Sequence, residues 1–142
     1  MLIGRRTHAD NIFKADRARL LARAHLDVVR RRERMAGHLV AVAELRLQLL
    51  EGRARMAALG HPIHVSAADV NVARGELKLA RLNLRFRGLN TELVMRQLRH
   101  AEAAYQHRRA RHFEFVMEAL QKAGHPSARH SRLNQPIRWA TP

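Results

Sequence analysis

The amino-acid sequence predicts an all-α protein, a long antiparallel helical hairpin followed by an irregular C-terminal tail. Apolar residues recur at seven-residue intervals along two long stretches, residues 9–59 and 67–123, as they do on one face of a packed α-helix. A short segment with Gly and Pro, residues 60–66, separates the two stretches, and so short a connection favours antiparallel neighbours. Only 4% of the residues are aromatic, which is typical of helices that pack on helices through Ala and Leu.

The first predicted helix covers residues 9–59 and follows a basic lead-in of residues 1–8. Thr7 and Asp10 have the spacing of a capping pair for its first turn. Six apolar residues of this helix are spaced seven apart, and we expect them to form the seam that contacts the second helix. They are Leu21, Val28, Met35, Val42, Leu49 and Met56.

The predicted loop, residues 60–66, has a stop signal followed by a start signal. Gly60 can adopt the left-handed backbone conformation that ends many helices, and Pro62 cannot continue the helical hydrogen bonds. Ser66 with Asp69 three residues later is a capping-box pattern. The second helix is therefore expected to begin near residue 67.

The second predicted helix, residues 67–123, has a fuller apolar pattern that occupies two heptad positions and defines a seam. One position holds Val70, Leu77, Leu84, Leu98 and Tyr105. The position three residues later holds Ala73, Ala80, Val94, Ala101 and Phe115.

Interior glycines leave an alternative open. A kink at Gly37, Gly52 or Gly88 would turn the hairpin into a three- or four-helix bundle, because Gly costs about 1 kcal/mol relative to Ala in a helix. Residues 38–50 and 76–86 alternate in a strand-like way, but they are rich in Leu and Ala, so we expect helix there too.

The last predicted segment, residues 124–142, is a basic irregular tail. Gly124 and Pro126 repeat the stop signal of the loop, and no apolar periodicity follows. Arg138 and Trp139 are its candidate partner anchors, since a lone tail Trp has no local core to enter. Phe113 is a third candidate anchor because it lies on a different helical face from Phe115. Phe13, Phe86, Tyr105 and Phe115 are expected to fill the seam or a partner's groove.

Net charge is the strongest compositional signal. The chain has 27 Lys and Arg against 12 Asp and Glu, for a net charge of +15, and nearly all the cations are Arg. Arg binds phosphate or carboxylate through a planar fork, so this excess predicts a polyanionic partner. GC-rich coding would explain the ratio of Arg to Lys, but not the excess of positive charge.

The positive charge is unevenly distributed. Residues 1–37 have ten basic and four acidic side chains, whereas residues 38–69 have three of each. Folding the hairpin so that paired residue numbers sum to about 129 would gather Arg side chains from both helices into one belt. The predicted nucleic-acid-binding residues are Arg23, Arg30, Arg31, Arg32, Arg34, Arg96, Arg99, Arg108, Arg109 and Arg111.

Several classes of function lack a sequence signal. There is no Cys, no Glu-x-x-His motif, no nucleophile elbow and no Walker-type glycine run, so we expect no catalytic site, metal, cofactor or small-molecule substrate. No stretch has the length and apolarity of a membrane span. The N-terminus lacks the apolar segment of a secretory signal, which favours an intracellular protein, and its Arg content leaves an organellar presequence open.

Two functional hypotheses follow. The first is a non-enzymatic structural subunit of a nucleic-acid-containing assembly, a ribonucleoprotein or ribosome-like particle. Its clustered Arg would bind the phosphate backbone of a nucleic acid, which we expect to be RNA rather than DNA, beside other protein subunits. The alternative is a coiled-coil stalk or scaffold that binds an acidic protein, such as a secretion-ATPase shaft or a microtubule-associated structural protein.

Overall fold

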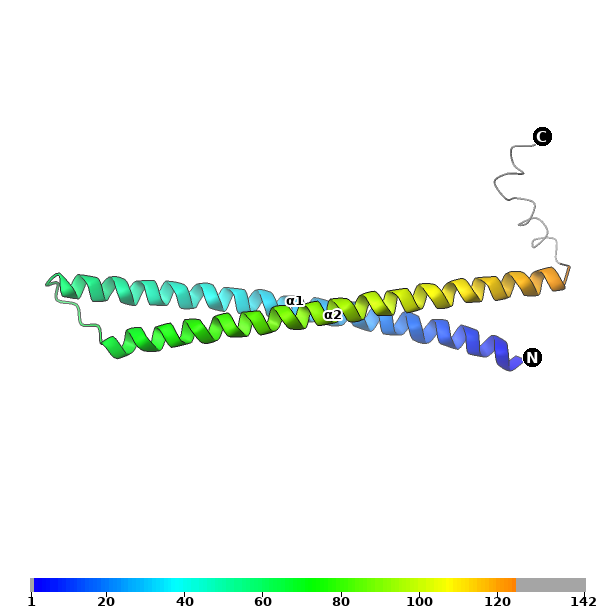
Figure 1. Cartoon of the computed structure of the whole chain (residues 1–142), viewed down its shortest axis with the longest axis horizontal. Coiled ribbons are helices and arrows are strands. Elements are labelled where there is room, and N and C mark those ends of the chain that lie inside the picture. Colours follow the sequence, from blue (N-terminus) through cyan, green and yellow to red (C-terminus); the bar gives the residue numbers. More distant parts are fainter. Residues whose placement is uncertain (1, 125–142) are drawn as a thin grey trace, which may run out of the picture. The chain divides into compact units, whose positions relative to one another are not determined.

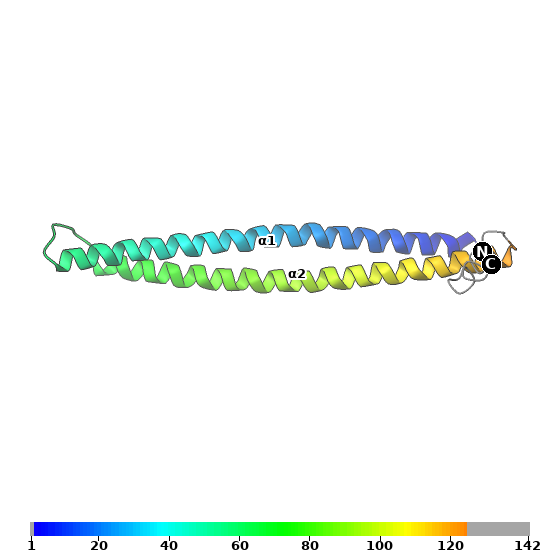
Figure 2. The ribbon, with the colours of Figure 1, turned by 90° about the horizontal axis from the view of Figure 1, so that it is seen from above.

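The computed structural model describes residues 2–124, with side chains from His8 onward, and this part of the chain forms two α-helices. Helix α1 covers Leu2–Ala58 and helix α2 covers Ala67–Lys122. The two helices run antiparallel and side by side (Figure 1 and Figure 2). The predicted all-α helical hairpin is therefore confirmed. The predicted tail beyond Gly124, with the anchor candidates Arg138 and Trp139, lies outside the described residues.

The contacts of the chain divide into two compact units. We call residues 22–98 the loop unit, and residues 1–21 with 99–142 the terminal unit. Each unit has its own set of contacts between α1 and α2.

Both helices are continuous through their glycines. α1 includes Gly37 and Gly52, and α2 includes Gly88, so the alternative of a kinked three- or four-helix bundle is not realised. The two strand-like stretches are helical as well. α1 also begins earlier than the predicted residue 9, because Leu and Arg in the predicted lead-in are good helix formers and no Pro interrupts them.

The loop between the helices has the predicted caps. Gly60 has a φ of 89°, in the left-handed region. The backbone N–H of Gly60 donates to Ala57, and that of His61 donates to Met56, which is the hydrogen-bond pattern of a Schellman motif. Ser66 Oγ accepts hydrogen bonds from the N–H groups of Ala68 and Asp69 at 3.1 and 3.3 Å, and so caps α2.

The helices of the loop unit contact each other along an inner seam of buried apolar residues. Val29 of α1 and Val94 of α2 are only 1% and 2% exposed, and they form a cluster with Leu26. The predicted α2 pattern is confirmed, since four of its residues are buried there. The inner seam consists of Leu26, Val29 and Ala36 on α1, and Val70, Ala73, Leu77 and Val94 on α2.

The predicted α1 seam was wrong by one residue. All six residues of the seven-residue stripe, from Leu21 to Met56, are exposed. Val28 immediately precedes the buried Val29, and Met35 immediately precedes the buried Ala36. A one-residue step turns the side chain by about 100°, so the two stripes face different directions. The buried stripe has smaller side chains, which let two helices approach more closely.

The register also differs from the prediction. Three ion pairs join the helices of the loop unit: Arg46 to Glu76 at 3.0 Å, Arg74 to Glu51 at 3.2 Å and Arg81 to Glu44 at 2.9 Å. The numbers of the paired residues sum to 122 to 125, not to the predicted value near 129. The loop sets this register, because α1 ends at Ala58 and α2 begins at Ala67.

The terminal unit has polar and aromatic contacts between its helices. His8 stacks on Phe115 with ring centroids 5.1 Å apart, and the Arg19 guanidinium lies 4.3 Å from the centre of the Tyr105 ring. Tyr105 and Phe115 thus occupy the predicted seam. Phe13 does not, because it is 68% exposed.

Candidate functional site

Two surfaces of the loop unit expose apolar side chains at the spacing of a helix-packing seam. The first is on α1. We call it the outer stripe of α1; its members are 40 to 62% exposed and recur three, four or seven residues apart. It consists of Val28, Met35, Leu39, Val42, Leu49 and Met56. Arg32, Arg46 and Arg53 fill the remaining positions of the same pattern, so this face of α1 is both apolar and basic.

The second surface is on α2 and was not predicted from the sequence. We call it the outer stripe of α2; its members are 53 to 68% exposed. It consists of Val72, Leu79, Leu82, Phe86, Leu89 and Leu93. Phe86 therefore lies outside the inner seam, contrary to one of its two predicted roles. The available signal was a second heptad pattern, two residues after the inner seam: Leu79 follows the buried Leu77, and Val72 follows Val70.

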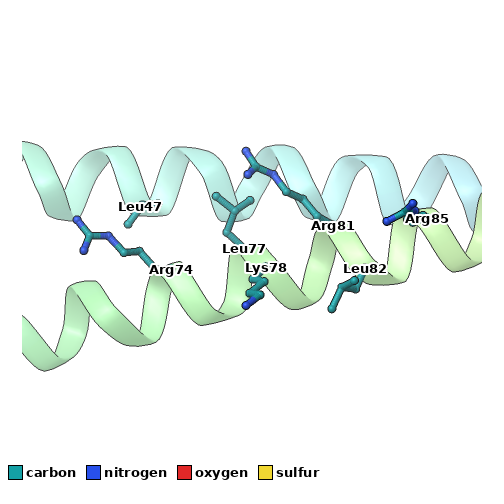
Figure 3. Close-up of a pocket in the computed structure, with 7 residues that line it drawn as sticks. All are labelled: Leu47, Arg74, Leu77, Lys78, Arg81, Leu82 and Arg85. Carbon is teal, nitrogen blue, oxygen red and sulfur yellow. The ribbon is translucent and has the colours of Figure 1, made fainter.

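A basic groove lies between the inner seam and the outer stripe of α2 (Figure 3). Leu77 in this groove points toward α1, whereas Lys78 and Leu82 point away from it. The groove is lined by Leu47, Arg74, Leu77, Lys78, Arg81, Leu82 and Arg85.

The four cations of the groove fall into two pairs. Arg74 and Arg81 form ion pairs with Glu51 and Glu44 of α1. Lys78 and Arg85 form no ion pair within the described part of the chain. The groove therefore combines an apolar floor with two cations available to an external anion.

The predicted nucleic-acid-binding residues of the loop unit are exposed. Arg30, Arg31, Arg32 and Arg34 lie within five residues of α1, interrupted by Glu33, and none forms an ion pair among residues 8–124. Arg96 on α2 is likewise exposed and unpaired over those residues. Arg23 is exposed but has an interaction partner.

These Arg side chains do not form one belt across both helices of the loop unit. Arg31 lies two residues after the buried Val29, about 200° around α1, so it points away from α2. Arg96 lies two residues after the buried Val94 and points away from α1 for the same reason. What the loop unit has is a collar, Arg30 to Arg34, around the exposed side of α1.

The predicted residues of the terminal unit are exposed on α2. They are Arg99, Arg108, Arg109, Arg111 and Phe113. The Phe113 ring is thus accessible, as its predicted anchoring role requires.

The described residues include no group of three or more His, Asp or Glu side chains placed to hold a metal ion. Neither helix, within the part that the structure describes, contains a stretch long and apolar enough to span a bilayer.

Comparison of the chain with protein families, with curated proteins and with solved structures finds no match.

Proposed function

We propose that this protein is a non-enzymatic coiled-coil scaffold that binds another protein along the outer stripe of α1. The observation that carries the proposal is the exposure of six large apolar side chains at heptad spacing on a helix whose inner seam is already occupied. Exposed apolar side chains that recur on one helix face are characteristic of an interaction site, and six of the nine positions of this pattern, from Val28 to Met56, are apolar.

The charge beside this stripe favours an acidic partner. Arg32 and Arg53 share the face of the stripe, and neither has a carboxylate partner in the described residues. A partner with Asp or Glu beside its apolar contacts would pair with these cations, whereas a basic partner would be repelled. This complementarity supports a protein partner of opposite charge.

Glu substitution at Met35 and Val42 tests this proposal. We expect the double variant to keep the helix content of the wild type, because both side chains are exposed, and to lose its protein partner, because two carboxylates would enter an apolar interface. The measurement is site-specific photocrosslinking in cells through an aryl ketone at Leu39, followed by nuclease treatment and identification of the adduct.

The matched control is Gln48→Glu, at an exposed polar position of the same helix, which should leave crosslinking unchanged. An adduct that persists in the Met35→Glu, Val42→Glu variant, or that contains only nucleic acid, would contradict the scaffold proposal.

A second candidate function, contact with RNA phosphates, is favoured by the collar from Arg30 to Arg34. Four neighbouring guanidinium groups without carboxylate partners in the described chain provide a local positive field. Such contacts are independent of sequence and sensitive to salt, because binding releases counterions from the nucleic acid.

Filter binding to a structured RNA across a salt series tests this candidate. We expect Arg31→Glu with Arg34→Glu to reduce affinity by about tenfold or more at low salt and to flatten the salt slope. Arg53→Glu with Arg55→Glu makes the same change in net charge within residues 38–69, where basic and acidic side chains are equal in number. This variant should have a smaller effect on RNA affinity. Binding that is weak at low salt and has no salt slope would remove this candidate.

A further inference from the structure

The outer stripe of α2 and the groove beside it form a second surface, separate from the outer stripe of α1. Leu82 belongs to both the stripe and the groove, and it points away from α1 (Figure 3). The stripe therefore continues into a concave, basic edge lined by Lys78 and Arg85.

The exposed apolar side chains of this surface have the spacing at which one α-helix packs on another. Leu79, Leu82, Phe86, Leu89 and Leu93 alternate three- and four-residue steps, which is the seam that an α-helix presents to another helix. Gly75 continues the pattern toward Val72, and a Cβ built there meets nothing within 4 Å, so the surface is open at that end. The occupant that fits is a helix with its own apolar seam.

Charge defines the chemistry of that helix. Lys78 and Arg85 are seven residues apart on one edge of the stripe, the position from which a side chain reaches the flank of a docked helix. On the opposite edge Glu76 is already paired with Arg46, and Asn83 and Asn90 are neutral. Glu92 lies at the far end of the Lys78 edge. The charge that remains to be matched beside the groove is therefore positive.

A second copy of this chain leaves at least one of the two cations unmatched. Antiparallel packing of the stripe on itself, with Leu79 against Leu82 of the other copy, would bring Lys78 next to Arg85. Packing with Leu79 against Leu89 would place Lys78 next to Glu92 of the other copy, but it would bring the two Arg85 side chains together. Parallel packing would bring Lys78 and Arg85 next to Asn83 and Asn90. The outer stripe of α1 offers Arg32 and Arg53 on its own face. With a net charge of +15 on each chain, two copies would also repel each other.

We propose that the outer stripe of α2 docks an acidic amphipathic helix of another protein, with its apolar seam on Leu79, Leu82 and Phe86 and its carboxylates on Lys78 and Arg85. This inference extends the proposed scaffold function to a second face, so that the hairpin holds partners on both helices.

Binding of a designed peptide to the full chain tests the proposal. The probe is a fluorescently labelled helix of about four heptads with Leu at a and d and Glu at e and g, compared with a peptide that has Lys at e and g. We expect the wild type to bind the Glu peptide at least tenfold more tightly than the Lys peptide. Lys78→Glu with Arg85→Glu should reverse this preference, and Leu79→Glu with Phe86→Glu should weaken binding of the Glu peptide at least tenfold.

Two controls separate this surface from the rest of the molecule. Phe113→Glu makes the same kind of change at an exposed aromatic residue of α2 outside the stripe and should leave the affinity unchanged. Met35→Glu with Val42→Glu removes binding to the outer stripe of α1, which fits the same peptide, so the preference for the Glu peptide and its dependence on Leu79 and Phe86 should persist in that background. Loss of peptide binding in that variant alone would move the site to α1, which overturns this inference and leaves the scaffold proposal intact.

Other occupants give different results. A dimer in sedimentation equilibrium that dissociates in the Leu79→Glu, Phe86→Glu variant would assign the stripe to a second copy. Competition by structured RNA that depends on Lys78 and Arg85, but not on Leu79 and Phe86, would assign the edge to phosphate. Equal affinity for both peptides in every variant would remove the site.

Discussion

Substitution of Val29 by Asp is expected to lower the free energy of unfolding of the loop unit by about 3–4 kcal/mol. Val29 is the most buried side chain of α1 and lies in one cluster with Leu26 and Val94. A carboxylate there would lose its hydration and would have no partner on either helix. Urea unfolding followed by circular dichroism measures the effect.

The matched control is Val28→Asp, the same substitution one residue earlier on the outer stripe of α1. We expect that variant to differ from the wild type by only about 0.5 kcal/mol, because its carboxylate would remain in water. If Val28→Asp were the more damaging change, the assignment of inner and outer faces on α1 would be reversed.

Substitution of Ala36 by Leu has the second largest expected effect, a loss of about 1–3 kcal/mol. Ala36 is 2% exposed at the interface with α2, where extra methyl groups would push the helices apart or force strained rotamers. Thermal unfolding at fixed protein concentration measures the loss.

Ala41→Leu is the control for this prediction, since Ala41 is an exposed residue of the same helix and Leu has nearly the helix propensity of Ala. We expect its stability to match that of the wild type. A stabilised Ala36→Leu variant would mean that the inner seam has room for larger side chains and is not closely packed.

The sequence was sufficient to predict the hairpin, its loop and the seam of α2, because each has an unambiguous local signal. Gly60 and Ser66 are residues whose backbone and side-chain chemistry ends and begins helices. Val70, Ala73, Leu77 and Val94 occupy two heptad positions, and two positions define one face.

The seam of α1 could not be identified because α1 has two candidate stripes one residue apart. Hydrophobicity favours the stripe with Met35, Val42 and Leu49, whereas packing uses the neighbouring one with Leu26, Val29 and Ala36. Which stripe faces α2 depends on how closely the helices approach, and single-helix periodicity does not contain that information.

Only part of the arrangement of charged side chains could be predicted from the sequence, for a related reason. Residues 38–69, which have equal numbers of basic and acidic side chains, provide Glu44, Arg46 and Glu51 for ion pairs with α2. Arg31 and Arg96 do not meet in the predicted belt for two reasons. The register differs from the predicted one by a few residues, which moves Arg96 relative to the collar, and neighbouring residues on a helix point in different directions. Tertiary register, which charge counts do not fix, decides which cations meet.

Among the described residues, seven apolar side chains are buried and twenty large ones are exposed. An isolated chain with so little interior should have modest stability, and any protein that covers the exposed residues would raise its melting temperature in proportion to the logarithm of its concentration. On the scaffold proposal, copies synthesised in excess of the proposed partners would be unfolded more often and degraded by proteases, so the cellular amount of this chain would follow the amount of those partners.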